Sequence, residues 1–367
     1  MVDTHTQVAG PDLALDHLPT PYLVVDHDVL SANITRLHRH LAGAGLAVRP
    51  HVKTHKVLEI AALQVAAGAR GLTLATVGEA EVFADSGYAD LFIAYPLWVD
   101  EGRAQRLRQL AGTARIAIGV DSVEAAERLT GLLDPRVELM VEVDSGHHRT
   151  GCRPGEAGAV AAAARAGGLS VRGVFSFPGH SYAPDAAAGV AAQEEEALRV
   201  AAESLRAVGV LPEVISGGST PSAAEMGAGV LTEARPGVYV VNDAQQWELG
   251  RCAREDVALT AYGRVVSSRP GRVVLDTGSK VLGGDRAGYA TGYGRLLDHP
   301  EARIVQLSEH HAVVDLPEGL HRPPLGALLR VVPNHVCVAV NLVDHLRVVQ
   351  RGHPPRTWSV AARGAHT

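Results

Sequence analysis

The sequence predicts a (β/α)8 TIM barrel followed by an antiparallel β-domain. From about residue 46 to residue 243, short β-branched runs alternate with longer segments of helical spacing. After Gly250, short apolar runs follow one another with only turn residues between them. Strands that alternate with helices indicate a parallel sheet, and eight such repeats favour a closed barrel over an open sheet. We therefore expect the barrel at residues 20–247 and the β-domain at residues 248–367, to which residues 1–19 can add a strand.

The expected elements follow from these runs. The eight strand candidates are Leu46–Lys53, Gly71–Thr76, Leu91–Tyr95, Arg115–Val120, Val137–Val143, Val171–Phe177, Glu213–Ser216 and Gly237–Val241. The helix candidates between them include Val57–Ala67, Glu79–Ser86, Val123–Leu133, Glu156–Ala166 and Val190–Ala207. A further helix is expected at Asp28–Ala42, where Asp26 or Asp28 can cap the first turn.

The β-domain is predicted from six runs without intervening helices: LTAYGRVVSS, GRVVLDTG, ARIVQLS, HAVVDLP, ALLRVVP and HVCVAVNL. Runs of this kind, joined by turn residues, are typical of antiparallel sheets.

Composition excludes several classes of protein. The 367 residues include 34 Lys and Arg against 40 Asp and Glu, a net charge of −6, which makes binding to nucleic acid or an anionic membrane by charge improbable. Three widely spaced cysteines argue against a disulfide framework. No run approaches the ~20 apolar residues of a membrane span. We expect a cytoplasmic protein, and its 18 histidines point to metal or acid–base chemistry.

A lysine follows the first expected barrel strand, in the segment RPHVKTHK. The active site of such a barrel lies at the carboxyl ends of the strands. Lys53 would be desolvated there, with His51 on the same side of the pleat, and a lower pKa would make it a nucleophile for carbonyl compounds. The alternative, which the segment alone leaves equally open, is that both are ordinary rim residues.

Two glycine-rich turns follow the seventh strand and open the eighth. Ser216–Thr220 combines two glycines with two hydroxyls, and Gly237 again permits close approach of a ligand. Successive N–H groups in such turns bind anions, and barrels often bind phosphate after strands seven and eight. Phosphate opposite a strand-end lysine is the arrangement that pyridoxal phosphate requires.

Polar side chains also follow the fifth and sixth strands. Arg149 in VDSGHHRTG either faces the phenolic oxygen of the cofactor or forms a salt bridge within its loop. In GHSY, His180 and Tyr182 are candidates for an acid, a base or a contact to the cofactor ring. A histidine simply hydrogen-bonded in its loop is the plainer alternative for His180.

One metal signal lies in the β-domain, at PNHVC. On a strand, His335 and Cys337 would point to the same face, and imidazole with thiolate suits zinc. Two protein ligands leave positions open for water or substrate, as in a catalytic site. Taken alone, the pattern fits a buried, inert cysteine better. Cys152 and Cys252 have no partner at such spacing.

The motifs taken together resemble one family. RPHVKTHK, LATVGEAEVFADSG, VDSGHHRTG, GHSY, SGGSTPSA, RPGVYVVND and PNHVCVAVNL, in this order over residues 19–350, are similar to D-serine dehydratase-like proteins of fold-type III, which are related to D-threonine aldolases and alanine racemases. The resemblance implies a barrel of the alanine racemase type with a β-domain, pyridoxal phosphate, a divalent metal (zinc, with Mn, Mg or Co as alternatives) and a homodimer.

The resemblance also implies roles for individual residues. Lys53 would bind the cofactor covalently, and His335 and Cys337 would bind the metal. The expected cofactor contacts are Arg149, Tyr182, Gly218, Ser219, Thr220, Gly237 and Tyr239, and the expected catalytic residues are Lys53 and His180. Arg235 either meets the pyridine nitrogen, as in alanine racemases, or pairs with a carboxylate.

The implied reaction is the dehydration and deamination of a D-β-hydroxy-amino acid, D-serine giving pyruvate and ammonia. The alternative is cleavage of the D-threonine aldolase type to glycine and an aldehyde. Those aldolases tend to have Asp where Cys337 stands and a motif different from GHSY, which favours the dehydratase. An amino-acid racemase and a non-catalytic pyridoxal phosphate carrier are further alternatives. His310 and Ala312 replace an expected acidic residue and glycine, so the substrate is the least determined part.

Overall fold

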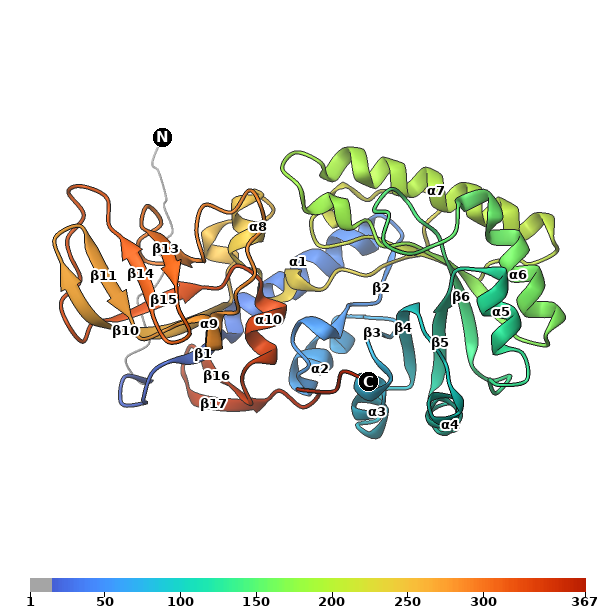
Figure 1. Cartoon of the computed structure of the whole chain (residues 1–367), viewed down its shortest axis with the longest axis horizontal. Coiled ribbons are helices and arrows are strands. Elements are labelled where there is room, and N and C mark those ends of the chain that lie inside the picture. The colour runs from blue at the N-terminus through green and yellow to red at the C-terminus, as the bar shows by residue number, and fades with distance from the viewer. Residues whose placement is uncertain (1–14) are drawn as a thin grey trace. The chain divides into compact units, whose positions relative to one another are not determined.

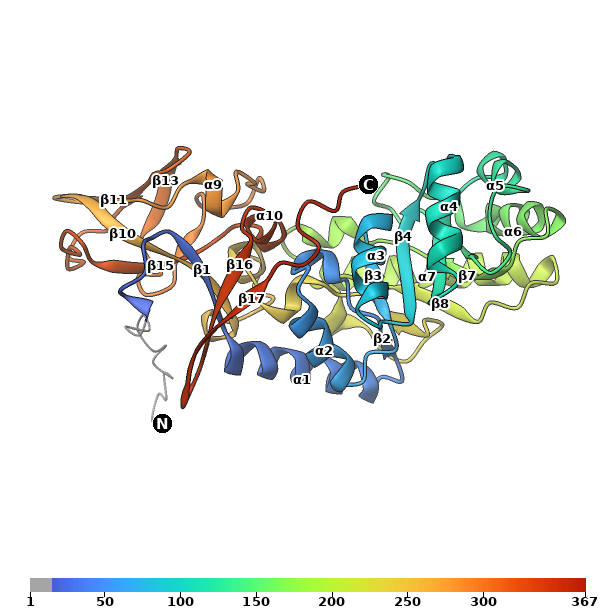
Figure 2. The same cartoon turned by 90° about the horizontal axis from the view of Figure 1, so that it is seen from below.

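The computed structural model describes residues 15–367, and the chain divides into two compact units. One unit, here called the barrel, comprises Thr35–Lys53, Leu58–Gly237 and Gly364–Thr367. The other, here called the β-domain, comprises the described residues up to Ile34, Thr54–Val57 and Val238–Arg363. Figures 1 and 2 show the elements of each unit from two directions.

The barrel is built on eight parallel strands, which confirms the predicted fold class. They are β2 (Ala47–Val48), β3 (Leu72–Leu74), β4 (Asp90–Pro96), β5 (Arg115–Val120), β6 (Glu138–Glu142), β7 (Val171–Phe175), β8 (Val214–Gly217) and β9 (Glu233–Ala234). They pair in chain order from β3 to β9, and β9 pairs with β2. A parallel bridge between His51 and Thr73 joins the two edges, so the sheet closes.

Helix α1 (His27–Gly43) precedes the barrel strands, as expected, and one helix follows each strand from β2 to β7. These helices are α2 (Leu58–Ala66), α3 (Val77–Asp85), α4 (Glu101–Leu110), α5 (Val123–Leu129), α6 (Ala157–Ala166) and α7 (Ala187–Ala207). Asp26 caps α1, because its carboxylate accepts hydrogen bonds from the N–H groups of Asp28 and Val29. The pattern of apolar residues had not shown α4, whose N-cap is Asp100.

Two of the expected barrel strands differ from the structure. The first ends at Val48 instead of Lys53, because Pro50 has no N–H for the ladder, and a 3-10 turn follows at Val52–Thr54. His51 and Lys53 therefore do not share a pleat. The eighth strand is Glu233–Ala234, and Gly237–Val241 is not a strand. Pro236 interrupts the ladder there, and Val238–Val240 forms a 3-10 turn.

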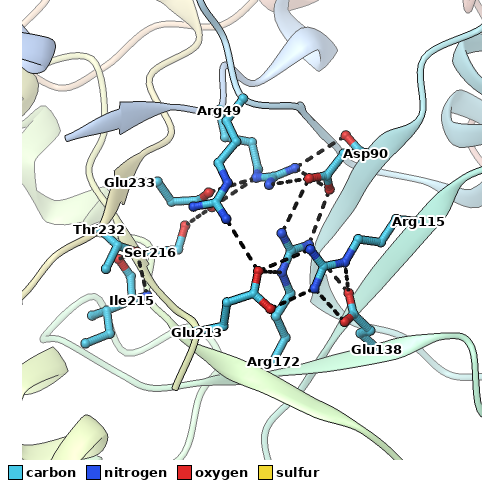
Figure 3. A network of polar contacts seen from close by, with 11 residues as sticks. Arg49, Asp90, Arg115, Glu138, Arg172, Glu213, Ile215, Ser216, Thr232 and Glu233 are labelled. Carbon is cyan, nitrogen blue, oxygen red and sulfur yellow. Dashed lines mark hydrogen bonds and ion pairs between the residues drawn. The ribbon is translucent and has the colours of Figure 1, made fainter. Parts of the chain in front are cut away.

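The amino end of the barrel is closed by a ring of charges with one side chain from each strand or the residues beside it (Figure 3). Four are basic and four acidic: Arg49, Arg70, Arg115 and Arg172, with Asp90, Glu138, Glu213 and Glu233. Above this ring, apolar side chains fill the interior, and the rings of Phe92 and Phe175 meet edge to face at 5.0 Å. The barrel interior is therefore a packed core.

The β-domain contains a nine-stranded, mostly antiparallel sheet, as predicted. Its strands are β1 (Tyr22–Asp26), β10 (Leu259–Arg269), β11 (Arg272–Leu275), β12 (Arg295–Leu296), β13 (Arg303–Leu307), β14 (Ala312–Asp315), β15 (Leu328–Val332), β16 (His345–Gln350) and β17 (His353–Ser359). The order is β11-β14-β13-β12-β15-β10-β1-β16-β17, and β11 also pairs with β10, which closes six strands into a ring. Part of the strand expected from residues 1–19 lies outside the described residues.

The last predicted run of the β-domain is a helix and not a strand. HVCVAVNL forms α10 (Val336–Asn341), preceded by His335 at the N-cap position. Pro333 ends β15, and the carboxylate of Asp243 accepts the hydrogen bond of the Val336 N–H, which starts the helix. Short helices α8 (Ala244–Glu248) and α9 (Ser279–Leu282) were also not expected. None of the helices in residues 15–367 combines the length and apolar composition that crossing a membrane requires.

Candidate active site

The carboxyl end of the barrel brings Lys53 and Arg149 to one aromatic ring. Lys53 lies on the 3-10 turn after β2, Arg149 on the loop after β6, and Phe177 on the loop after β7. The Lys53 Nζ is 5.8 Å and the Arg149 Cζ 4.9 Å from the centre of the Phe177 ring. A ring face attracts cations at such distances, so Phe177 orients both side chains without forming a salt bridge.

Two histidines extend this group. The His147 ring meets Phe177 edge to face at 5.6 Å and stacks on His180 at 6.3 Å between centroids. The Nε2 atom of His180 lies 3.1 Å from Oε1 of Gln193 on α7. The Nδ1 atom of His180 is buried without a hydrogen-bond partner. His180 thus presents one fixed and one available nitrogen.

Two buried titratable groups lie beside these loops. Burial, aided by the charges of Lys53, Arg235 and Arg149, lowers the pKa of His51 well below its usual range, so its imidazole is neutral at pH 7. Burial raises the pKa of Glu142, at the end of β6, to about 7 against the opposing effects of Thr150 and Arg149. The Nδ1 of His51 and the Oε2 of Glu142 are buried without partners.

The expected phosphate loops meet through hydroxyl groups. Ser219 Oγ is 2.7 Å from Ser181 Oγ, on the GHSY turn, and 2.9 Å from Ser222 Oγ. Thr220 Oγ1 accepts a 3.3 Å hydrogen bond from the N–H of Gly237. These bonds join the loops that follow β7, β8 and β9, and we name Ser219, Thr220 and Gly237 the phosphate cradle.

The other predicted cofactor residues are distributed as follows. The N–H of Gly218 donates to the carboxylate of Glu194 on α7. Tyr182 ends the 3-10 turn Gly179–Tyr182, and Tyr239 is buried in the 3-10 turn Val238–Val240, which belongs to the β-domain.

Arg235 lies inside the barrel with its charge between two rings. Its guanidinium donates to Ser216 Oγ at 2.5 Å and to the carbonyl of Ser176, while Phe92 and Phe175 lie within 5.7 and 5.3 Å. These partners are a hydroxyl and a carbonyl and not the expected carboxylate, while the expected contact with the pyridine nitrogen stays a prediction. Burial lowers the pKa of Arg235, and the nearby carboxylates of Glu233, Glu194 and Glu142 oppose this effect.

Pyridoxal phosphate fits the chemistry of this end of the barrel. The group requires a lysine amine, hydrogen-bond donors for phosphate and polar partners for its ring. Lys53, the hydroxyl-rich cradle and four buried polar atoms without partners, on His51, Glu142, Ser145 and His180, supply these types. Buried polar atoms without partners are costly in a folded protein, and a bound polar ligand is one way in which such atoms are satisfied.

The predicted metal ligands lie on the β-domain. The Nδ1 of His335 lies 2.8 Å from Oδ2 of Asp285, and Asn334 Nδ2 donates to the Asp285 carbonyl at 3.1 Å. Burial lowers the pKa of His335, but Cys337 and Asp285 outweigh it and raise the value to about 10. Within residues 15–367, no group of three or more His, Cys, Asp or Glu side chains is arranged to hold a metal ion. His335 and Cys337 therefore form an incomplete ligand pair.

The donor set nevertheless fits zinc. A histidine that binds metal through one nitrogen usually donates its other N–H to a carboxylate, which is how Asp285 meets His335. The position of Cys337 in the first turn of α10 corrects the expected strand geometry, yet Cys337 still hydrogen-bonds the imidazole.

Sequence reasoning missed four residues that shape these sites. Phe177, Gln193, Glu194 and Asp285 act through contacts between segments far apart in the chain. Phe177 could have been noticed because it directly precedes the GHSY motif, but nothing in the sequence pattern marks the other three.

Both units of the chain match known protein families. Residues 25–245 match the family model described as alanine racemase, N-terminal domain, and residues 258–349 match the putative serine dehydratase domain. The D-threo-3-hydroxyaspartate dehydratase of Delftia sp. is 33% identical over 93% of this chain and 97% of its own length. A D-threonine aldolase of Arthrobacter sp. is 31% identical over 97% and 96%.

Solved structures show the same similarity as the sequence comparisons. The Delftia dehydratase superposes with a TM-score of 0.87 at 31% identity, over 94% of this chain and 98% of its own. A variant of a D-threo-3-hydroxyaspartate dehydratase with one cysteine replaced by alanine is described as a metal-free form, and another variant has a histidine replaced by alanine two positions earlier in its chain. That spacing equals the spacing of His335 and Cys337.

Proposed function

We propose that this chain, which belongs to the fold-type III pyridoxal phosphate family related to alanine racemases, is a metal-dependent lyase that dehydrates a D-β-hydroxy-amino acid. Its relatives are named as a dehydratase and aldolases of such amino acids. The observation that supports the proposal most is Lys53 at the carboxyl end of the barrel, beside Phe177 and Arg149.

The cofactor would be held by Lys53 at its aldehyde and by Ser219, Thr220 and Gly237 at its phosphate. Bound pyridoxal phosphate supplies an electron sink for the electrons released at Cα. The Lys53 amine, oriented over the Phe177 ring, would take the Cα proton at Nζ. Because His51 is neutral, it adds no positive charge that would disfavour protonation of the Lys53 amine.

His180 would act as a second polar group at the same end. Its Nε2 is engaged by Gln193 and its buried Nδ1 has no partner, so Nδ1 is the atom that would hydrogen-bond substrate or cofactor. Arg149 would contribute positive charge near the ring of Phe177, which favours anionic groups of a ligand.

A divalent metal, most simply zinc, would be held by His335 and Cys337, with Asp285 orienting the imidazole. Such a metal supplies a Lewis acid, the chemistry that turns a hydroxyl into a better leaving group. The metal-free cysteine variant of a D-threo-3-hydroxyaspartate dehydratase, with a histidine variant two positions earlier, supports this choice of ligands.

Elimination is favoured over carbon–carbon cleavage. D-serine would lose water, and hydrolysis of the resulting imine would take up one water and release ammonia, so that the net products are pyruvate and ammonia. D-threo-3-hydroxyaspartate would give oxaloacetate and ammonia in the same way. The alternative, cleavage of D-threonine to glycine and acetaldehyde, is supported by the aldolase relatives at similar identity. Cys337 in place of the expected aspartate favours elimination.

Product analysis tests this proposal. The purified protein, loaded with pyridoxal phosphate and Zn²⁺, is incubated with D-serine, D-threo-3-hydroxyaspartate or D-threonine, and keto acid, ammonia and glycine are measured. We expect keto acid and ammonia in equal amounts. Glycine without keto acid would reject the dehydratase. An amino-acid racemase would instead invert the substrate and keep its activity after chelation.

A further inference from the structure

Helix α7 contacts two loops at the carboxyl end of the barrel through three consecutive residues. Gln193 meets His180 on the loop after β7. Glu194 meets Gly218 at the start of the segment between β8 and β9, and Glu195 accepts a 2.5 Å hydrogen bond from the N–H of Val230 near its end. The segment that contains Ser219 and Thr220 of the phosphate cradle is therefore attached to α7 at both ends.

The attachment at Glu194 is completely buried. Both carboxylate oxygens lie 3.0 Å from the N–H of Gly218, and Oε1 accepts a 2.5 Å hydrogen bond from Ser176 Oγ on the loop after β7. The residue is only 1% exposed. Removing this acceptor would leave the N–H of Gly218 and the hydroxyl of Ser176 buried and unsatisfied, which is unfavourable.

The two glycines of the loop are required by this contact. A Cβ on Gly217 would lie 2.8 Å from Glu194 Oε1 and 2.7 Å from Leu231, so any side chain there would displace the carboxylate. Gly218 has φ +81°, a left-handed conformation that L-residues rarely adopt, and this directs its N–H at Glu194. The glycine pair thus serves the contact to α7 as well as the approach of a ligand.

We propose that Glu194 is a positioning residue for the cofactor phosphate: it fixes the Gly218 backbone from behind, so that Ser219 and Thr220 face the phosphate together with Gly237. The inference rests on the proposed pyridoxal phosphate function. Glu194 does not touch the phosphate in this scheme, because its oxygens are engaged by Gly218 and Ser176. The N–H of Gly218 is correspondingly directed to α7 and does not serve as a phosphate donor.

The contribution of Glu194 is geometric and does not come from its charge. A carboxylate near a phosphate opposes anion binding, so a neutral side chain of the same shape must serve at least as well. In Glu194→Gln, the amide oxygen can accept from Gly218, and the amide N–H can donate to the hydroxyl of Ser176, which is able to accept. In Glu194→Ala, both partners lose their acceptor.

The test compares two ligands that differ only in the phosphate. Dissociation constants for pyridoxal phosphate and for pyridoxal are measured by absorbance titration of the apoprotein, for the wild type, Glu194→Ala and Glu194→Gln. The matched control is Glu196→Ala on the same helix, because Glu196 is exposed and pairs with Arg199. We expect Glu194→Ala to weaken the binding of pyridoxal phosphate about tenfold or more and to change the binding of pyridoxal much less. Glu194→Gln and Glu196→Ala should bind both ligands as the wild type does.

Two results would overturn the inference. The first is an unchanged dissociation constant for pyridoxal phosphate in Glu194→Ala. The second is an equal loss of affinity for pyridoxal phosphate and pyridoxal, which would indicate general loosening of the fold. If Glu194→Ala does not fold, Glu194→Asp is used, since its carboxylate is one methylene too short to reach Gly218 and Ser176 together. If the wild type and these variants bind pyridoxal phosphate with the same dissociation constant, only the inference is rejected. If the wild type does not bind pyridoxal phosphate, the proposed function is rejected as well.

Discussion

The Nε atom of Arg49 lies 3.0 Å from both carboxylate oxygens of Glu233, and both side chains are 1% exposed. Arg49 also pairs with Asp90 at 2.9 Å, and Glu233 accepts from Ser216 Oγ at 2.8 Å (Figure 3). Through Ser216, the pair links the charged ring at the amino end of the barrel to Arg235 inside the barrel. Its ions have lost their water, so each depends on the other for stability.

Arg49→Met should destabilise the barrel by about 3–5 kcal/mol, because it leaves Glu233 buried without its counter-ion. The free energy of unfolding is measured in urea. Arg70→Met is the control, since Arg70 is exposed and its contact with Glu213 is 3.4 Å long, and it should cost less than about 1 kcal/mol. Similar losses in both variants would contradict the assignment. Adding Glu233→Gln to Arg49→Met should recover part of the lost stability.

Glu142 should make the stability of the apoprotein depend on pH. Burial raises its pKa from 4.5 to about 7, so between these values the folded state binds a proton that the unfolded state has released. Stability from this group is complete below pH 4.5 and is lost as the pH rises through 7. Relative to wild type, Glu142→Gln should therefore gain on the order of 1–3 kcal/mol between pH 5 and pH 8. A difference between the two proteins that does not change with pH would contradict this prediction.

Asp285→Asn should weaken zinc binding about 10–100-fold, because the amide cannot replace the carboxylate that orients His335. Affinity is measured by competition with a chromophoric chelator. Asp315→Asn is the control, since Asp315 forms an exposed ion pair with Arg272 elsewhere in the β-domain. Removing zinc with a chelator should abolish elimination in the wild type, and activity should return when zinc is restored. Equal affinities of the two variants would exclude a role for Asp285.

Gly179→Ala should reduce activity between about tenfold and a hundredfold while the protein stays folded. A Cβ there would lie 2.4 Å from the His147 Nε2, so the stack of His147 on His180 must move. Gly189→Ala on α7 meets nothing within 4 Å and serves as the control. Steady-state rates and thermal melting are measured for both variants. Wild-type rates in Gly179→Ala would show that the stack of His147 on His180 is not needed for activity.

The fold was largely predictable because its signals are local. Seven of the eight expected strand segments overlap barrel strands, since β-branched runs and turn residues lie side by side in the sequence. The errors in placing strands occurred at prolines. Pro50 and Pro236 remove ladder donors, and Pro333 ends β15 before His335, so three segments that look apolar and alternating are turns or a helix.

The sites were predictable only in part. Lys53, His335 and Cys337 stand in motifs that the sequence shows directly. The residues that orient them do not, because Phe177 meets Lys53 and Arg149 across 124 and 28 positions of chain, and Glu194 reaches Gly218 from a helix. The charged ring at the amino end of the barrel likewise takes its residues from eight separate segments, and no local sequence pattern predicts it.

The central claim is that Lys53 holds the cofactor of a lyase. The chain has only three lysines, Lys53, Lys56 and Lys280, so each can be replaced in turn. After pyridoxal phosphate is added, an absorbance band at about 420 nm, as expected for lysine-bound cofactor, should appear in the wild type, Lys56→Ala and Lys280→Ala. Lys53→Ala should lose both this band and the release of keto acid from D-β-hydroxy-amino acids. A band that persists in Lys53→Ala, or keto acid formed without Lys53, would contradict the account.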